Sequence, residues 1–225
     1  MATIPAGLIR HFRNPARALL MLCTVLLVSA TAQSAAEAAP AKRAGHVYLM
    51  RGIFNVFSLG MDQMAYKLEA AGVAATVANH TSWRSMADDM IANYRSGNRE
   101  PIILMGHSAG ADATISIARR LEQASVPVAL IVNFDPVSPD PVPPNVKSVV
   151  NYYVPAGWGA AVAADKQFKG KLANVNENAT TNHFSIDKDD NLQRQAIARV
   201  MAVTGGGRKP AKKKPAQELS AAPAP

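Results

Sequence analysis

Short apolar runs alternate with longer amphipathic segments between residues 45 and 204. A continuous apolar run of strand length indicates a buried strand, whereas apolar residues that recur every three or four positions indicate a helix. The runs predict strands at 46–50, 73–78, 101–105, 128–134, 147–154 and 171–175. The amphipathic segments predict helices at 60–71, 82–95, 109–124 and 191–203, the first with Met61, Met64, Tyr66 and Leu68 near one stripe.

The order of these elements predicts the fold class. Strands without polar alternation are buried on both faces of a sheet, and strands that alternate with helices form right-handed parallel crossovers. We therefore expect an α/β protein, a three-layer sandwich with a mainly parallel sheet, over residues 45–204. The proline-rich connection at 135–145 cannot be helical. A domain of this length leaves little room for a lid domain.

The first 38 residues have the organisation of an export signal. Three arginines precede an apolar run at 18–32, and small residues follow it. This order predicts a signal peptide at 1–38 and a periplasmic or extracellular protein. The apolar run is short for a bilayer span, and an uncleaved membrane anchor is the alternative. Cys23, the single cysteine, lies in this segment, so the exported chain would contain no disulfide.

The positive charge of the chain is confined to its two ends. Lys and Arg number 24 against 16 Asp and Glu, yet residues 44–204 carry fourteen of each kind. Duplex binding needs a basic face on the folded part, so we expect no nucleic-acid partner. Residues 205–225 are rich in Pro, Ala and Lys, which predicts a disordered basic tail suited to weak contact with an anionic envelope surface. The oligomeric state stays open.

A Gly-x-Ser-x-Gly motif follows the predicted strand at 101–105. It runs from Gly106 to Gly110 and leads directly into the predicted helix at 109–124. In this strand, turn and helix context the central Ser108 sits on a sharp turn that exposes its hydroxyl, and only glycines let strand and helix pass so closely. The motif therefore predicts Ser108 as a nucleophile.

A serine hydroxyl needs a base, normally a histidine that a carboxylate orients. His183 is the one histidine downstream of Ser108, after the last predicted strand and before the final helix. Asp135 directly follows the strand at 128–134, where its side chain can reach the carboxyl edge of the sheet. Asp165, after the next strand, is the alternative acid. Asp187 is too close to His183 in sequence to be favoured.

Negative charge on the attacked carbonyl needs N–H donors. The amide of Ala109, which follows the nucleophile, is one candidate. The second is the amide of Ile53 or Phe54, because Gly52 lets the turn after the first strand point its amides inward. Arg51, before this turn, either holds a carboxylate or forms an ion pair in the loop.

Three aromatic residues are further candidates for the site. Trp158, together with Tyr152 or Tyr153, lines the acyl or leaving-group side in one interpretation and belongs to the core in the other.

The segments LMRGIFN, LMGHSAGAD, VNFDPV and NHFSID resemble the α/β-hydrolase superfamily, and more narrowly its small bacterial lipase-like and thioesterase-like serine hydrolases. The resemblance covers residues 45–204, with Arg51 standing where many members have histidine. It implies a minimal α/β-hydrolase fold without a lid domain. It also implies hydrolysis of a small-molecule or lipid-like ester or thioester by Ser108, His183 and Asp135, without a cofactor.

Two other functions stay open on the sequence. One is a non-catalytic envelope binding protein of hydrolase ancestry, and the other is an acyltransferase that uses the same three residues. No metal-ligand spacing such as His-x-x-x-His occurs, so we expect no metal.

Overall fold

The computed structural model describes residues 40–205. The predicted signal peptide at 1–38 and the predicted tail at 205–225, Gly205 apart, lie outside the described residues. The strands are β1 (His46–Arg51), β2 (Ala74–Asn79), β3 (Ile102–His107), β4 (Leu130–Phe134), β5 (Ser148–Tyr153) and β6 (Lys171–Asn176). The helices are α2 (Gly60–Ala70), α3 (Trp83–Arg95), α4 (Ala109–Gln123) and α5 (Asp190–Thr204), with short 3-10 turns between some elements.

The six strands form one sheet in the order β2-β1-β3-β4-β5-β6, and every neighbouring pair is parallel. Each predicted strand and helix is present, with ends within about two residues of the prediction. The largest differences are two residues: β3 extends to His107, and β4 begins at Leu130 because Val128 forms only an isolated bridge to Val146.

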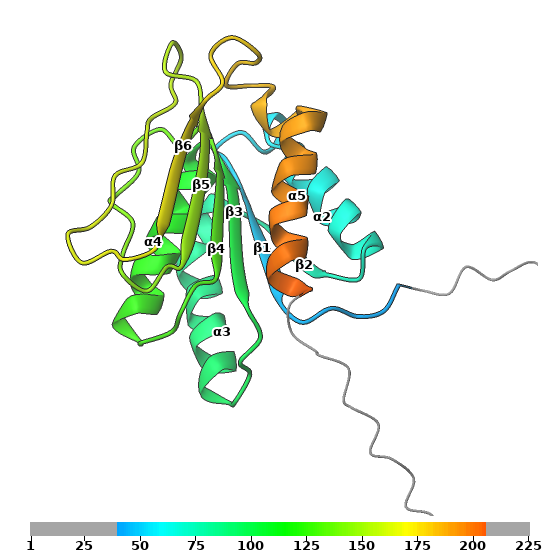
Figure 1. Ribbon diagram of the computed structural model, residues 1–225, viewed down its shortest axis with the longest axis vertical. Coiled ribbons are helices and arrows are strands. Elements are labelled where there is room, and N and C mark those ends of the chain that lie inside the picture. Colours follow the sequence, from blue (N-terminus) through cyan, green and yellow to red (C-terminus); the bar gives the residue numbers. More distant parts are fainter. Residues whose placement is uncertain (1–39, 206–225) are drawn as a thin grey trace, which may run out of the picture. The chain divides into compact units, whose positions relative to one another are not determined.

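Helices cover both faces of the sheet, which gives the predicted three layers (Figure 1). Residues of α2 and α5 pack on one face in a first hydrophobic cluster, and residues of α3 and α4 pack on the other in a second. Among the helices in residues 40–205, none is long and apolar enough to cross a membrane.

The apolar stripe of α2 differs from the prediction at one residue. Met61, Met64 and Leu68 are fully buried, whereas the side chain of Tyr66 is exposed. A helix turns by roughly 100° per residue, so Tyr66 lies about 200° around the axis from Met64 and Leu68. The stripe therefore excludes Tyr66.

The sheet topology brings several loops to one edge. After β2, the chain passes back over β1 and continues with β3 on its other side, so the order of the strands reverses at β1. Ligands of open α/β sheets bind at the carboxyl ends of the strands beside such a reversal. The connections from β4 to β5 and from β5 to β6 contain no helix. They are irregular loops at the edge of the sheet formed by β6 (Figure 1).

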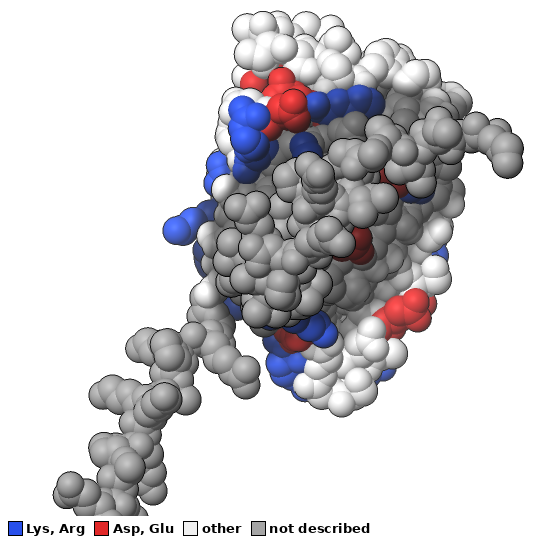
Figure 2. Space-filling view, turned by 90° about the vertical axis from the view of Figure 1, so that its right-hand side faces the viewer, with Lys and Arg blue, Asp and Glu red and all other residues white. Residues whose placement is uncertain are grey.

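Basic and acidic side chains are mixed on the face that Figure 2 presents. The described residues also form ion pairs, such as Arg51 with Asp62 and Lys67 with Asp190. The balance of fourteen basic and fourteen acidic residues in 44–204 is thus realised partly as local pairs.

Candidate active site

Ser108 occupies the turn between β3 and α4 in a left-handed backbone conformation, with φ 58° and ψ −131°. Two glycines permit this turn. A Cβ on Gly106 would lie 2.3 Å from the carbonyl oxygen of Gly110, and a Cβ on Gly110 would lie 2.1 Å from that of Met50. The strained serine conformation is held because the start of α4 packs closely against the backbone of β1 and β3 at these two glycines.

Three polar side chains from distant parts of the chain meet at Ser108. His183 Nε2 lies 3.1 Å from Ser108 Oγ, and His183 Nδ1 lies 2.6 Å from Asp135 Oδ2. Asp135 is completely buried and His183 is 7% exposed. Since a carboxylate only accepts, His183 Nδ1 donates to Asp135, and its Nε2 is left to accept the Ser108 proton.

The carboxylate of Asp135 is fixed by the ends of β4 and β5. Its backbone N–H donates to the Tyr152 carbonyl at 2.7 Å, and its Oδ1 accepts from the Val154 N–H at 2.6 Å. Its second oxygen is thereby directed to His183. A Cβ on Gly159 would lie only 1.6 Å from Asp135 Oδ1, so Gly159 is required at this point. Sequence reasoning missed Gly159, because the loop at 154–170 has no regular pattern.

The alternative acid Asp165 lies elsewhere. It accepts from Arg119 at 3.1 Å, in an ion pair between the loop and α4. The structure thus brings Asp135, and not Asp165, to His183.

The turn after β1 lies directly beside the nucleophile. A Cβ on Gly52 would be 3.0 Å from Ser108 Cβ, which brings the peptide joining Gly52 to Ile53 close to the hydroxyl. Among residues 40–205, the amides of Ile53, Phe54 and Ala109 donate to no other protein group. All three predicted donors are therefore available to a ligand.

Arg51 points away from this turn and pairs with Asp62 of α2, with Nε 2.8 Å from Oδ2. The hydrogen bond between them raises the pKa of Arg51 and lowers the pKa of Asp62. Arg51 thus forms an ion pair, as one of its two expected roles requires, but the partner carboxylate lies in α2 and not in the loop.

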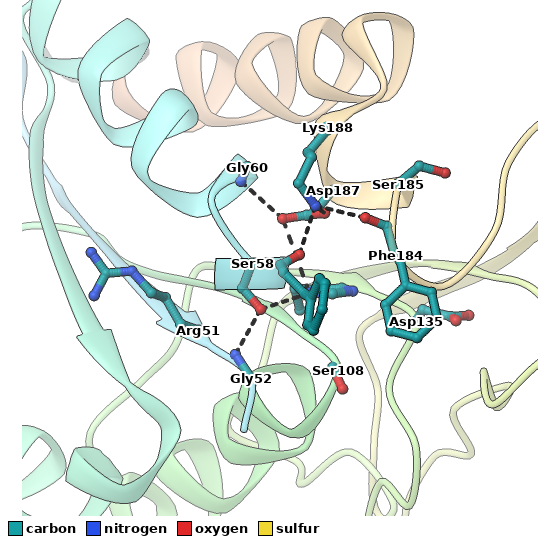
Figure 3. Close-up of polar contacts among 12 residues, drawn as sticks. Arg51, Gly52, Ser58, Gly60, Ser108, Asp135, Phe184, Ser185, Asp187 and Lys188 are labelled. Atoms are coloured by element: carbon teal, nitrogen blue, oxygen red, sulfur yellow. Dashed lines mark hydrogen bonds and ion pairs between the residues drawn. The ribbon is translucent and has the colours of Figure 1, made fainter. Parts of the chain in front are cut away.

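A second polar cluster lies behind the first and was not predicted. His107, the residue before the nucleophile, is buried and contacts Ser58 Oγ at 2.8 Å through Nδ1 and the His183 carbonyl at 2.7 Å through Nε2. Ser58 also accepts from the Gly52 N–H at 3.0 Å (Figure 3). Burial lowers the pKa of His107, while the charge of Asp187 acts in the opposite direction. The motif placed His107 beside Ser108 but gave no signal for its partners.

Two cavities adjoin His183. The first, which we call the serine cavity, has about 380 Å³ and contains Ser108; its apolar wall is formed by Ile53, Phe54, Phe57 and Val137. The second, which we call the outer cavity, has about 450 Å³ and is lined by Val154 and by three uncharged polar residues, Asn178, Thr181 and Asn182. Trp158, His183 and Phe184 line both cavities.

The aromatic candidates separate into two groups. Trp158 is 61% exposed and packs edge-on against His183, with ring centroids 5.0 Å apart, so it belongs to the site. Tyr152 is fully buried and stacks on Phe134 in the core. Neither Tyr152 nor Tyr153 lines the two cavities, so of the two interpretations the core one holds for Tyr152 and the site one for Trp158.

Within residues 40–205, no group of three or more His, Cys, Asp or Glu side chains is arranged to hold a metal ion.

Comparison with known proteins identifies the fold. A family model described as a thioesterase domain matches residues 58–145, which include Ser108 and Asp135 but not His183. Among solved structures, the type II thioesterase BorB from the borrelidin biosynthetic cluster aligns with a TM-score of 0.52 at 11% identity. The alignment covers 74% of this chain and 94% of that one. The chain has the α/β-hydrolase fold.

Two other solved structures are similar to this α/β-hydrolase fold. A cutinase-like protein from Cryptococcus sp. aligns with a TM-score of 0.46 at 17% identity, over 75% of this chain and 98% of that one. The NocB thioesterase domain from the nocardicin cluster aligns with a TM-score of 0.46 at 14% identity, over 73% and 96%. No curated protein matches the chain. The predicted resemblance to thioesterase-like α/β hydrolases is confirmed.

Proposed function

We propose that the protein hydrolyses a carboxylic ester or thioester through an acyl-enzyme on Ser108. The observation that carries this proposal is the continuous hydrogen-bonded chain from Ser108 through His183 to Asp135. The thioesterase domain match supports the same reaction class. The order Ser108, His183 and Asp135 suits acyl transfer, in which a base takes the serine proton and a buried carboxylate orients the base.

In the proposed mechanism, Ser108 Oγ attacks the substrate carbonyl while His183 Nε2 accepts its proton. Asp135 holds the imidazole and stabilises its cationic form. The amide of Ala109 at the start of α4 donates to the developing oxyanion. The second donor is the amide of Ile53, favoured over that of Phe54 because it shares a peptide with Gly52, which lies against Ser108.

His183 then returns the proton to the leaving oxygen or sulfur, and the tetrahedral intermediate collapses to the acyl-enzyme. A water molecule, deprotonated by His183, attacks the acyl carbon in the second half of the reaction. Expulsion of Ser108 Oγ, which recovers its proton from His183, releases the acid and restores the enzyme.

The two cavities suggest how the substrate lies. The acyl group stays bonded to Ser108, so we assign it to the serine cavity and its apolar wall. The leaving group must lie near the proton on His183, so we assign it to the outer cavity, which His183 lines and Ser108 does not. An apolar acyl chain fits the first wall, and an uncharged leaving group with both apolar and polar surface fits the second.

A serine-reactive fluorophosphonate probe tests the proposal. We expect labelling of the folded protein at Ser108, mapped by peptide mass spectrometry, and loss of both labelling and esterase turnover in Ser108→Ala. Ser125→Ala is the matched control, because Ser125 has the same φ of 58° but lies at the far end of α4.

Three results would change the assignment. Full turnover by Ser108→Ala would overturn it. A folded protein that the probe does not label would favour the non-catalytic binding protein. Preferential transfer of the acyl group to an added alcohol over water would favour an acyltransferase.

We also propose that the protein is exported, on the strength of the signal-like segment at 1–38. Intact mass spectrometry of the protein from its native host tests this. We expect loss of about the first 30 to 38 residues, consistent with an A-x-A cleavage site in this segment. Retention of the full chain in the membrane fraction would instead support the uncleaved anchor.

A further inference from the structure

The cluster behind the triad contains buried polar groups that the proposed chemistry does not use. Ser58 and His107 are each 1% exposed, and Asp187 is completely buried. Burying polar side chains is costly unless they are hydrogen-bonded, and all three are. The hydrogen bonds of these three residues connect segments of the chain that are distant in the sequence.

The direction of each hydrogen bond follows from the groups involved. A carbonyl oxygen only accepts, so His107 Nε2 carries the hydrogen toward the His183 carbonyl. His107 is neutral at ordinary pH because burial lowers its pKa, which leaves Nδ1 as an acceptor. Ser58 therefore donates its hydroxyl hydrogen to Nδ1 and accepts from the Gly52 N–H. From the Gly52 N–H through Ser58 and His107 to the His183 carbonyl, every donor thus faces an acceptor.

This chain runs between two parts of the proposed catalytic apparatus. Its first end is Gly52, whose carbonyl forms the peptide with the Ile53 amide. Its other end is the backbone of His183, the proposed base. Among residues 40–205, no hydrogen bond joins Gly52 directly to His183, and the side chains of Ser58 and His107 bridge the two residues.

A second contact ties the same two segments together a few ångströms away. Asp187 Oδ2 accepts from the Gly60 N–H at 2.9 Å, and Lys188 Nζ donates to the carbonyls of Phe57 and Phe184 at 2.6 Å each. A Cβ on Gly60 would lie 2.1 Å from the Asp187 carbonyl oxygen, so the backbones approach closely. The segments at 52–60 and 183–188 are thus held as one unit.

We infer that Ser58 and His107 are positioning residues that hold the Gly52–Ile53 peptide and His183 in a fixed relation around Ser108. The inference rests on the proposed function. Neither residue takes part in bond making. The Ile53 amide and the His183 imidazole are therefore coupled. If one of them shifts, the hydrogen bonds through Ser58 and His107 move the other.

The inference predicts an effect on turnover rather than on substrate binding. A donor or base displaced by about 1 Å weakens transition-state contacts more than ground-state contacts, and such a displacement can cost roughly 100-fold in rate. For Ser58→Ala, which removes a single oxygen atom, we expect kcat to fall by roughly 10- to 100-fold while KM changes by less than about threefold.

Two substitutions at His107 separate its two contacts. His107→Gln places an amide near the position of Nε2 and keeps a donor for the His183 carbonyl, while it loses Nδ1. His107→Asn places an amide near Nδ1 and keeps a partner for Ser58, while it loses the bond to His183. Each is expected to lower kcat, and Ser58→Ala combined with His107→Gln is expected to cost no more than the larger single effect, because both break the same chain.

Thr114→Val is the matched control for a lost buried hydroxyl. Thr114 Oγ1 donates to Asn133 Oδ1 at 2.8 Å in a buried contact between α4 and β4, outside both cavities. We expect it to lower the melting temperature without lowering kcat. Every variant is measured at a temperature where circular dichroism shows it folded, and Ser58→Ala carries the test if the His107 variants do not fold.

The outcomes separate this inference from the proposed function. Loss of turnover in Ser108→Ala together with unchanged kcat in folded Ser58→Ala and in the folded His107 variants would overturn the positioning role alone. A rise in KM with kcat retained, or additive effects in the double variant, would also overturn it. Retention of turnover in Ser108→Ala would overturn the proposed function instead.

Discussion

Asp135 combines an unusual backbone with a fixed side chain. It adopts φ 55° at the end of β4, a conformation that few residues other than glycine, asparagine and aspartate take readily. Its two oxygens have different partners, Val154 on one side and His183 on the other. The sequence predicts Asp135 at the end of a strand and Asp165 in a loop. In the structure, the end of β4 holds the Asp135 side chain at the site. The left-handed conformation itself had no sequence signal.

Asp135→Asn is expected to lower kcat by roughly 1,000- to 10,000-fold with little loss of stability. An amide there donates to His183 Nδ1, which favours the tautomer with its hydrogen on Nε2 and removes the acceptor for the Ser108 proton. Steady-state kinetics on a chromogenic ester measure the effect. Asp165→Asn, which only breaks an ion pair with Arg119, is the control and should retain its turnover.

His107 gives the free energy of unfolding a dependence on pH. Burial lowers its folded pKa below the ordinary 6.5. The charge of Asp187 and the hydrogen bond to the His183 carbonyl act in the opposite direction, and the charges of His183 and Lys188 make smaller contributions that lower the pKa. Between the folded pKa and 6.5 the unfolded chain binds a proton that the folded chain does not, so stability rises with pH. Below the folded pKa this contribution is constant.

We therefore expect the free energy of unfolding, from urea titrations, to fall as pH decreases through 6.5. The slope should be smaller in His107→Gln, which cannot titrate. His46, whose pKa burial also lowers, is present in both proteins and cancels from the difference. Equal slopes in the two proteins would contradict the prediction.

At the scale of elements, regular segments were predictable and connecting segments were not. Helices and strands are encoded by local periodicity, and the glycines of the motif fixed how α4 meets β3. The loop between β5 and β6 and the segment between β6 and α5 have no such periodicity. They nevertheless supply Gly159, Trp158 and the His183 carbonyl that accepts from His107, because those contacts depend on which loops the sheet topology brings together.

Gly159→Ala tests the packing of the β5–β6 loop on the acid. A new Cβ would occupy the space of Asp135 Oδ1, so either the loop or the carboxylate must shift. We expect kcat to fall by at least about 100-fold while the fold is retained, since the loop is largely exposed and can move. Ala161→Ser, which adds one atom at an exposed position of the same loop, should behave as the wild type.

At the scale of the whole molecule, exposed apolar side chains gather around the serine cavity. Ile53, Phe54, Phe57, Val137 and Trp158 are all between 43% and 64% exposed. Solitary exposed apolar residues are common, but a contiguous group marks a binding surface. Of this group, the sequence suggested only Trp158 as an aromatic lining residue, since residues from three separate connections form the group.

The cavity predicts a dependence of kcat/KM on acyl length. Each methylene buried against the apolar wall is worth about 0.8 kcal/mol, or roughly fourfold in kcat/KM, until the cavity is full. A series of p-nitrophenyl esters from acetyl to dodecanoyl measures this slope. Phe57→Ala should flatten it. Leu59→Ala, an exposed apolar residue of the same segment outside the cavity, should not.

The indole of Trp158 forms part of the boundary between the serine cavity and the outer cavity. A smaller side chain there enlarges the space for both halves of the substrate at once. Under the proposed assignment of the two cavities, selectivity for the acyl group and selectivity for the alcohol or thiol are therefore not independent traits at this position. Divergence toward a new leaving group that uses Trp158 must be accompanied by compensating changes among the residues facing the acyl chain.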